Sequence, residues 1–104
     1  MSTDRELLEL AAKAAGIDGF WSGGYLSFIK RSGGSWSPLD DDGDALRLAV
    51  KLGIVIDTSA GEASVQYIVG GIARPITEYE VKGFQAATRR AIVRAAAEIG
   101  RAMP

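Results

Sequence analysis

Apolar side chains recur at helical spacing in three stretches of the chain, near its start, in its middle and near its end. The first stretch opens with Thr3 and Glu6, which form a capping-box pattern, and is followed by Gly16. The second follows a run of aspartates and stops at Gly53, and the third begins at Phe84. The spacing predicts helices over residues 4–15, 42–52 and 84–101.

The segment between the first two helices is rich in aromatic and β-branched residues and is interrupted by pairs of glycines. Residues 25–31 are its clearest strand. Gly23-Gly24 and Gly33-Gly34 flank this strand, and such pairs are typical of tight turns between antiparallel strands. The sequence therefore predicts short antiparallel strands here.

A second hairpin is predicted between the last two helices, from residues 54–56 and 63–69. The region that follows, residues 70–83, is expected to be a loop or an edge segment. Pro75 has no N–H to donate to a strand ladder, and Gly83 interrupts the stretch before the last helix.

This order of elements predicts one domain over residues 1–104, of the α+β class, with a small, mostly antiparallel four-stranded sheet and three helices. Three helices are enough to cover both faces of such a sheet. Trp21 and Trp36 are expected in the core, because aromatic residues of a small domain are usually buried. Further core positions are predicted at Leu7, Leu46, Ile54, Ile56, Ile92, Ala95 and Ile99.

The 104 residues include no cysteine and no histidine. A disulfide, a thiol nucleophile, a Ser-His-Asp triad and a cysteine-based zinc site are therefore excluded. The paired glycines also lack the spacing of a dinucleotide site or a P-loop. We expect a protein that is not an enzyme and carries no cofactor.

Net charge and hydropathy limit the partners further. The net charge is −1, and neither half of the chain has the excess of positive charge that holds nucleic acid, so we expect no nucleic-acid partner. The longest apolar runs fall far short of the roughly 20 residues of a membrane span. The first residues are mixed in charge, unlike a signal peptide. The sequence thus predicts a cytoplasmic protein, and it allows a homo-oligomer.

Three segments together point to a family. They are Trp36–Leu39, with the pattern Trp-x-Pro-Leu, the acidic helix start and apolar continuation at Asp42–Val50, and the Ala-rich stretch Ala87–Ala96. This combination resembles the phage ABA (α-β-α) sandwich family of small phage and prophage proteins. The resemblance implies a bacteriophage or prophage origin, residence in the bacterial cytoplasm and an accessory role. It brings no catalytic residues with it.

The acidic run Asp40, Asp41, Asp42 and Asp44 has two readings. Closely spaced carboxylates can bind Ca²⁺ or Mg²⁺, and an EF-hand loop beginning at Asp40 would need glycine at position 45 and glutamate at position 51. Those positions hold alanine and lysine. We therefore expect no metal, and assign the aspartates to the cap and the positive end of the second helix.

Residues on the last helix and on the preceding segment are the candidates for partner binding. Arg90, Arg94 and Arg101 are predicted to project from the last helix on the side away from its apolar face, with Arg89 nearby, and to contribute little to stability. Such a row suits an acidic partner or a phosphate, although cations also favour a helix C-terminus. The candidate set is completed by Arg74 and Tyr79 on the irregular segment and by Tyr25 on the aromatic strand.

Three functional hypotheses follow. The first is a non-enzymatic phage or prophage protein that binds a host macromolecule, in particular a host protein, and acts as an anti-defence inhibitor. The second is a protein that sequesters a small phosphorylated ligand, such as a cyclic nucleotide, between arginine and aromatic side chains. The third is a minor structural or assembly component of the virion.

Overall fold

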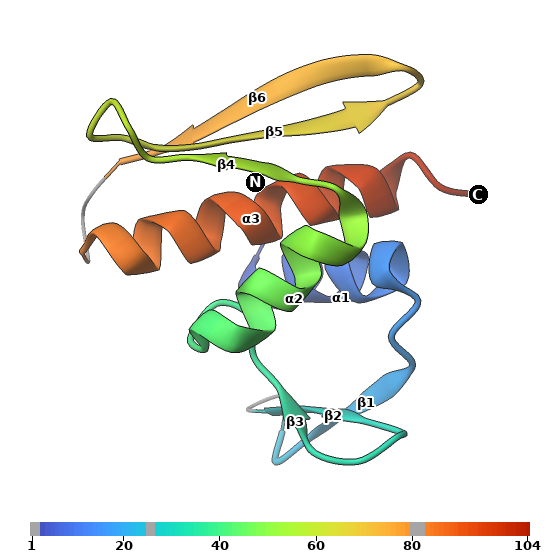
Figure 1. The fold of residues 1–104 in the computed structure, drawn as a ribbon. Helices are drawn as coiled ribbons and strands as arrows, with labels where there is room; N and C mark the ends of the chain where they lie inside the picture. Colours follow the sequence, from blue (N-terminus) through green and yellow to red (C-terminus); the bar gives the residue numbers. More distant parts are fainter. Residues whose placement is uncertain (1–2, 25–26, 80–82) are drawn as a thin grey trace.

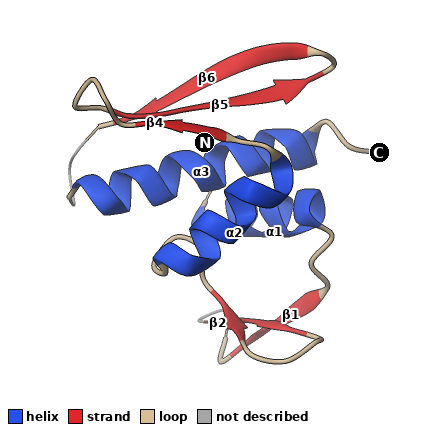
Figure 2. Cartoon of the chain, in the orientation of Figure 1, coloured by secondary structure: helices blue, strands red, loops and turns tan. Residues whose placement is uncertain are grey.

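The structure, a computed structural model, describes residues 3–24, 27–79 and 83–104. This part of the chain has an α+β fold in which three helices lie between two antiparallel sheets (Figures 1 and 2). The helices are α1 (Asp4–Ala15), α2 (Asp42–Leu52) and α3 (Phe84–Arg101). The first sheet contains β1 (Gly19–Ser22), β2 (Ser27–Lys30) and β3 (Ser35–Trp36), and the second contains β4 (Val55–Asp57), β5 (Ala63–Val69) and β6 (Ile72–Glu78).

The helix bounds agree with the prediction, and in α1 local capping groups account for them. The hydroxyl of Thr3 accepts a hydrogen bond from the Glu6 amide at 3.1 Å, and the Glu6 carboxylate accepts one from the hydroxyl in return. At the other end, Gly16 takes the left-handed conformation with φ 68° and closes α1. None of the helices in the described ranges is long and apolar enough to cross a membrane.

The predicted single four-stranded sheet is wrong. Each predicted hairpin acquires a third strand instead, so that two separate three-stranded sheets form. The resulting layers run from sheet through helices to sheet (Figure 1), whereas an α-β-α sandwich would place helices outside one sheet. The cause lies in α2, which separates the two hairpins in the sequence and packs between them in space.

For residues 70–83 the sequence predicts a loop or an edge segment, and in the described part of this range the edge segment is found: β6 is an edge strand of the second sheet. β6 pairs with β5 through the two-residue turn Gly70-Gly71, with Val69 opposite Ile72 and Gln66 opposite Pro75. Pairs in an antiparallel ladder alternate between hydrogen-bonded and non-hydrogen-bonded positions. Counted from the turn, Pro75 falls at a non-hydrogen-bonded position of an edge strand, where its missing N–H breaks no bond to β5.

The first sheet covers the helices with aromatic rings. Phe28 makes edge-on contacts with Trp21 and Trp36, at ring-centroid distances of 5.4 and 5.6 Å. Trp36 is buried as predicted, and Trp21 is partly buried against the core, with its indole N–H donating to Glu9 at 3.1 Å. Tyr25 belongs to the predicted strand 25–31 but lies outside the described residues; in the described part that strand is β2.

Two predicted core residues are exposed. The side chain of Leu46 is 57% exposed, because α2 turns Ala45, Leu48 and Ala49 toward α3 and leaves Leu46 on another side. Ile56 shares the inner face of its sheet with Val65, yet it is 37% exposed because β4 is a three-residue edge strand. The remaining predicted positions are buried or packed against the core: Leu7, Ile54, Ile92, Ala95 and Ile99.

The last helix, α3, is the centre of the fold. Six of its eight buried residues are alanine or glycine, which lets other backbones come close. The closest approach is to α1: a Cβ on Gly100 would overlap the carbonyl of Leu10. Lys13 also donates to the carbonyl of Met103 at 3.1 Å, so the C-terminal ends of α1 and α3 lie together.

We expect Gly100→Ala to lower the free energy of unfolding by about 1 to 3 kcal/mol, because the added methyl group would force the two helix backbones apart. Alanine is otherwise the better helix former, by up to about 1 kcal/mol. Urea denaturation measures the effect, with Gln85→Ala on the exposed side of α3 as the control. Unchanged or increased stability of Gly100→Ala would contradict the close contact of α1 with α3.

Candidate functional site

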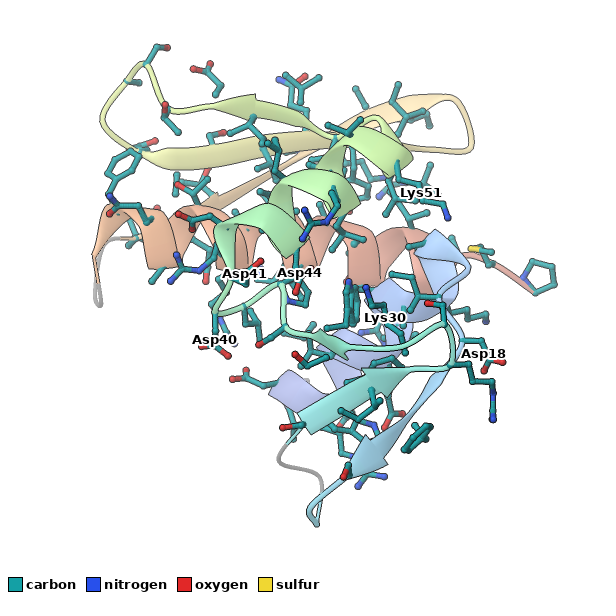
Figure 3. The ribbon with its side chains drawn as sticks, turned by 60° about the horizontal axis from the view of Figure 1, so that its bottom comes forward. Asp18, Lys30, Asp40, Asp41, Asp44 and Lys51 are labelled. Carbon is teal, nitrogen blue, oxygen red and sulfur yellow. The ribbon has the colours of Figure 1, made fainter. Side chains whose placement is uncertain are left out.

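Of the two aspartates that directly precede α2, Asp41 is the N-cap of the helix. Asp41 accepts a hydrogen bond from the Asp44 amide at 2.8 Å, and Asp40 accepts one from the Ser37 hydroxyl at 2.9 Å. Figure 3 shows Asp40, Asp41 and Asp44 at the start of α2 and Lys51 toward its other end, so each charge lies near the opposite pole of the helix dipole. In the described ranges no three acidic side chains are placed to hold a metal ion.

Asp44 is the buried carboxylate of this group. It accepts from the Ser37 amide at 2.9 Å and from Arg47 at 2.8 Å, which ties the start of α2 to the segment that follows β3. Burial raises the pKa of Asp44, but the hydrogen bonds from Ser37 and Arg47 and the positive charges of Arg47 and Lys30 together lower it by more. The pKa of Asp44 therefore lies below its ordinary value.

The arginines predicted to bind a partner are joined to acidic side chains of other elements. Arg90 contacts Asp4 at 2.9 Å and Glu78 at 3.3 Å, and Arg94 contacts Glu78 at 2.9 Å. Glu78 is only 19% exposed; it accepts a hydrogen bond from Arg94 and forms an ion pair with Arg90. These ion pairs connect α3 to α1 and β6, so Arg90 and Arg94 have a structural role that their spacing alone did not reveal.

The remaining candidates are spread along the molecule. Arg101 pairs with Glu98 at 3.6 Å and, together with Arg74, lines a shallow cavity near the end of α3. Arg90 and Arg101 are eleven residues apart on one helix, about 16 Å along its axis. Tyr79 is exposed beside Arg90. The predicted residues therefore do not converge on one site.

Arg89 illustrates the same balance of charge. Its side chain is 19% exposed, and it contacts the Asp42 carboxylate at 2.6 Å and donates to the Leu39 carbonyl at 2.9 Å. Because Arg89, Arg90 and Arg94 all have acidic partners, an added phosphate would have to compete with carboxylates already in place. The arginine face is thus a poor clamp for an anion.

An apolar groove lies between α2, β4 and the first half of α3. Its volume is about 360 Å³. Ala45 and Ile92 are buried in it, and the more accessible side chains of Leu46, Ile56 and Phe84 line it. Thr58, Gln85 and Thr88 add uncharged polar groups to the lining, and the Asp42 and Arg89 pair adds the charged ones.

The apolar surface continues from this groove along α2. Val50 follows Leu46 by one helical turn on the same side of α2 and is 73% exposed. The sequence carried a signal for this surface. Residues 45, 48, 49 and 52 complete the i, i+3, i+4, i+7 spacing of one buried stripe, so Leu46 and Val50 are apolar residues beyond what that stripe needs. We name Leu46, Val50, Ile56 and Phe84 the apolar groove residues.

The fold and this site define a small α+β protein with an open apolar groove and an internally balanced arginine face. Comparison with protein-family models, with curated proteins and with solved structures finds no match to the chain.

We expect the double variant Arg90→Glu with Arg94→Glu to lose about 1 to 3 kcal/mol of unfolding free energy, because it removes three ion pairs and places new carboxylates beside Glu78 and Asp4. Part of this loss should disappear at high salt. Arg31→Glu is the control, because the ion pair of Arg31 with Asp18 is well exposed. Its loss should lower the free energy of unfolding by less than about 1 kcal/mol. Equal stability of the double variant and the wild type would show that the ion pairs of Arg90 and Arg94 do not stabilise the fold.

The stability that Asp44 contributes should depend on pH. A carboxylate whose pKa is lowered by folding stabilises the protein above its unfolded pKa, near 3.9, and this contribution is lost as the pH falls through the lower, folded pKa. Asp44→Asn should therefore cost about 1 to 3 kcal/mol at pH 7, and the difference from the wild type should shrink below about pH 4. Urea unfolding at several pH values measures this. A difference that does not vary with pH would show that the charge of Asp44 is not responsible.

Proposed function

We propose that the protein is a non-enzymatic accessory protein that binds a host protein through the apolar groove residues. The observation that carries this proposal is the exposure of Leu46 and Val50, 57% and 73%, next to a groove with a buried apolar floor. Single exposed apolar residues are ordinary, but a group of them around a concavity is typical of a surface that meets a partner.

The phage or prophage origin, the host target and the role as an anti-defence inhibitor rest on the sequence resemblance to the phage ABA sandwich family alone, because the order of layers differs from that of an α-β-α sandwich. Sequestering a phosphorylated ligand is less well supported. That role needs guanidinium groups free to meet a phosphate, whereas Arg89, Arg90 and Arg94 are each paired with carboxylates. The Asp42 carboxylate that lines the groove is paired with Arg89 at 2.6 Å, which favours a structural role for it over that of a general base.

The test compares capture of host proteins from a bacterial lysate by the wild type and by Leu46→Asp. A charge in the centre of an apolar contact should cost 2 kcal/mol or more, about a 30-fold loss of affinity, while stability changes little because Leu46 is exposed. Ile68→Asp is the matched control, since Ile68 is equally exposed but lies on the outer face of the second sheet. Capture that is the same for wild type and Leu46→Asp would refute the proposal.

A further inference from the structure

The edge of the second sheet at β4 carries backbone groups without partners. Val69 and Ile72 flank the two-residue turn of the β5–β6 hairpin and form a hydrogen-bonded pair, and such pairs alternate with non-hydrogen-bonded ones along a ladder. Counted from this turn, the amide and carbonyl of Val65 point to β6. Ile56, which lies opposite Val65 in β4, therefore directs its own amide and carbonyl away from β5. Neither group of Ile56 has a hydrogen-bond partner in the described ranges.

The other edge of the same sheet is interrupted by a proline. β6 is the second edge strand (Figure 1), and the positions that it directs outward include Pro75, which has no N–H. A proline at such a position protects an edge against the addition of a further strand. The sheet therefore has one edge of seven residues that is protected and one of three residues, at β4, that is open.

The apolar groove lies beside the open edge. On the side of the sheet it is lined by Ile56 and Thr58, and among the described residues by none from β5 or β6. Because β5 occupies one side of β4, the groove lies on the other side, where a fourth strand would run. Leu46 and Phe84 line it from the helices. A strand about 4.8 Å from β4 would direct every second side chain to the inner face of the sheet, toward this groove.

A partner that covers Ile56 removes water from its amide and carbonyl. If these groups then remain without hydrogen bonds, the complex loses free energy. An extended segment can replace the bonds to water with bonds from its own backbone. A helix cannot, because its backbone groups are bonded to one another within the helix. The unpaired groups of Ile56 therefore favour an extended occupant.

We infer that the partner segment binds as an extended strand: it pairs with β4 through the amide and carbonyl of Ile56, continues the second sheet as a fourth strand, and places alternate apolar side chains in the groove against Leu46 and Phe84. This inference rests on the proposed function and specifies how the partner is recognised. Backbone hydrogen bonds align the segment with the edge, and the groove selects the side chains at every second position.

A second copy of the chain fits this edge less well. Twofold pairing of β4 with itself about Ile56 would set Asp57 of each copy opposite Val55 of the other. Hydrogen bonds from the hydroxyl and the amide of Ser59 lower the pKa of Asp57, so its carboxylate is ionised at neutral pH. Val55 is apolar and 57% exposed. Because a charge and an apolar side chain are poor cross-strand neighbours, the edge suits a segment of different sequence.

The probe is a library of random linear peptides displayed on particles, selected on the full-length wild-type protein and depleted on Leu46→Asp. The retained peptides should carry large apolar residues two positions apart, which is the period of a strand. Apolar residues three and four positions apart, the period of a helix, would overturn the inference, as would a selection in which no peptide depends on Leu46. Leu46-dependent capture of host proteins together with helical peptides would refute only this inference, whereas capture independent of Leu46 would refute the proposed function as well.

Backbone pairing is tested in a selected peptide by methylating one amide at a time. Sensitive and tolerant amides should alternate, and methylation of the amide that donates to Ile56 should weaken binding about three- to tenfold, as expected for one backbone hydrogen bond. Sensitivity that does not alternate would contradict pairing with β4.

Ile56→Pro makes the matching change in the protein, because it removes the N–H of Ile56 at an outward-directed position like that of Pro75. Ile56→Ala is the control, since it also shortens the side chain but keeps the N–H. A selected peptide should bind Ile56→Pro about three- to tenfold more weakly than Ile56→Ala. Equal affinities for the two variants would overturn the inference.

Hydrogen exchange in the wild type decides the question if Ile56→Pro does not fold. By NMR, the Ile56 amide should exchange freely in the protein alone and at least about tenfold more slowly when the protein is saturated with a selected peptide. Unchanged exchange of this amide would refute strand pairing. A dimer that forms without peptide and that peptide does not dissociate in sedimentation experiments would also refute it if the Ile56 amide is protected in that dimer, because a second copy would then cover the edge.

Discussion

The close contact between the backbones of α1 and α3 is the constraint on which the rest of the structure depends. Gly100 meets the Leu10 carbonyl where no larger residue fits, and the alanines of α3 continue the narrow surface along the helix. Because α3 packs against α1, α2 and the second sheet at once, it joins the other two helices to that sheet (Figure 1). Dispersion contacts over such close surfaces replace the large side chains that a core of this size would otherwise need.

This arrangement also explains where the polar residues of α3 lie. With several sides of the helix buried, Arg90 and Arg94 are left on the strip that faces β6 and the start of α1, where Glu78 and Asp4 are their neighbours. A guanidinium group there is partly shielded from water, so its charge must be balanced within the fold. The ion pairs of Arg90 and Arg94 therefore help to hold α3 against α1 and β6.

Local structure could be predicted from the sequence and long-range structure could not. The three helices begin and end at residues such as Thr3 and Gly16, whose caps depend only on near neighbours. The partners of Arg90, by contrast, are 86 and 12 residues away, and nothing in the spacing of the last helix specifies them. The division into two sheets was also hidden, because β3 has two residues and β6 contains Pro75, and each falls below the pattern that marks a strand.

The groove follows from the same long-range geometry, through the orientation of α2. Helix α2 carries apolar residues on more than one side, so its sequence permits several orientations about the helix axis. The packing of Ala45 and Ala49 against the small residues of α3 selects the orientation that is found. Once the alanines are inside, Leu46 and Val50 must face outward. Their exposure leaves apolar surface in contact with water on this side of α2. Under the proposed function a partner would desolvate this surface, and because interface contacts act mainly on the dissociation rate, the apolar contact would govern how long the complex lasts.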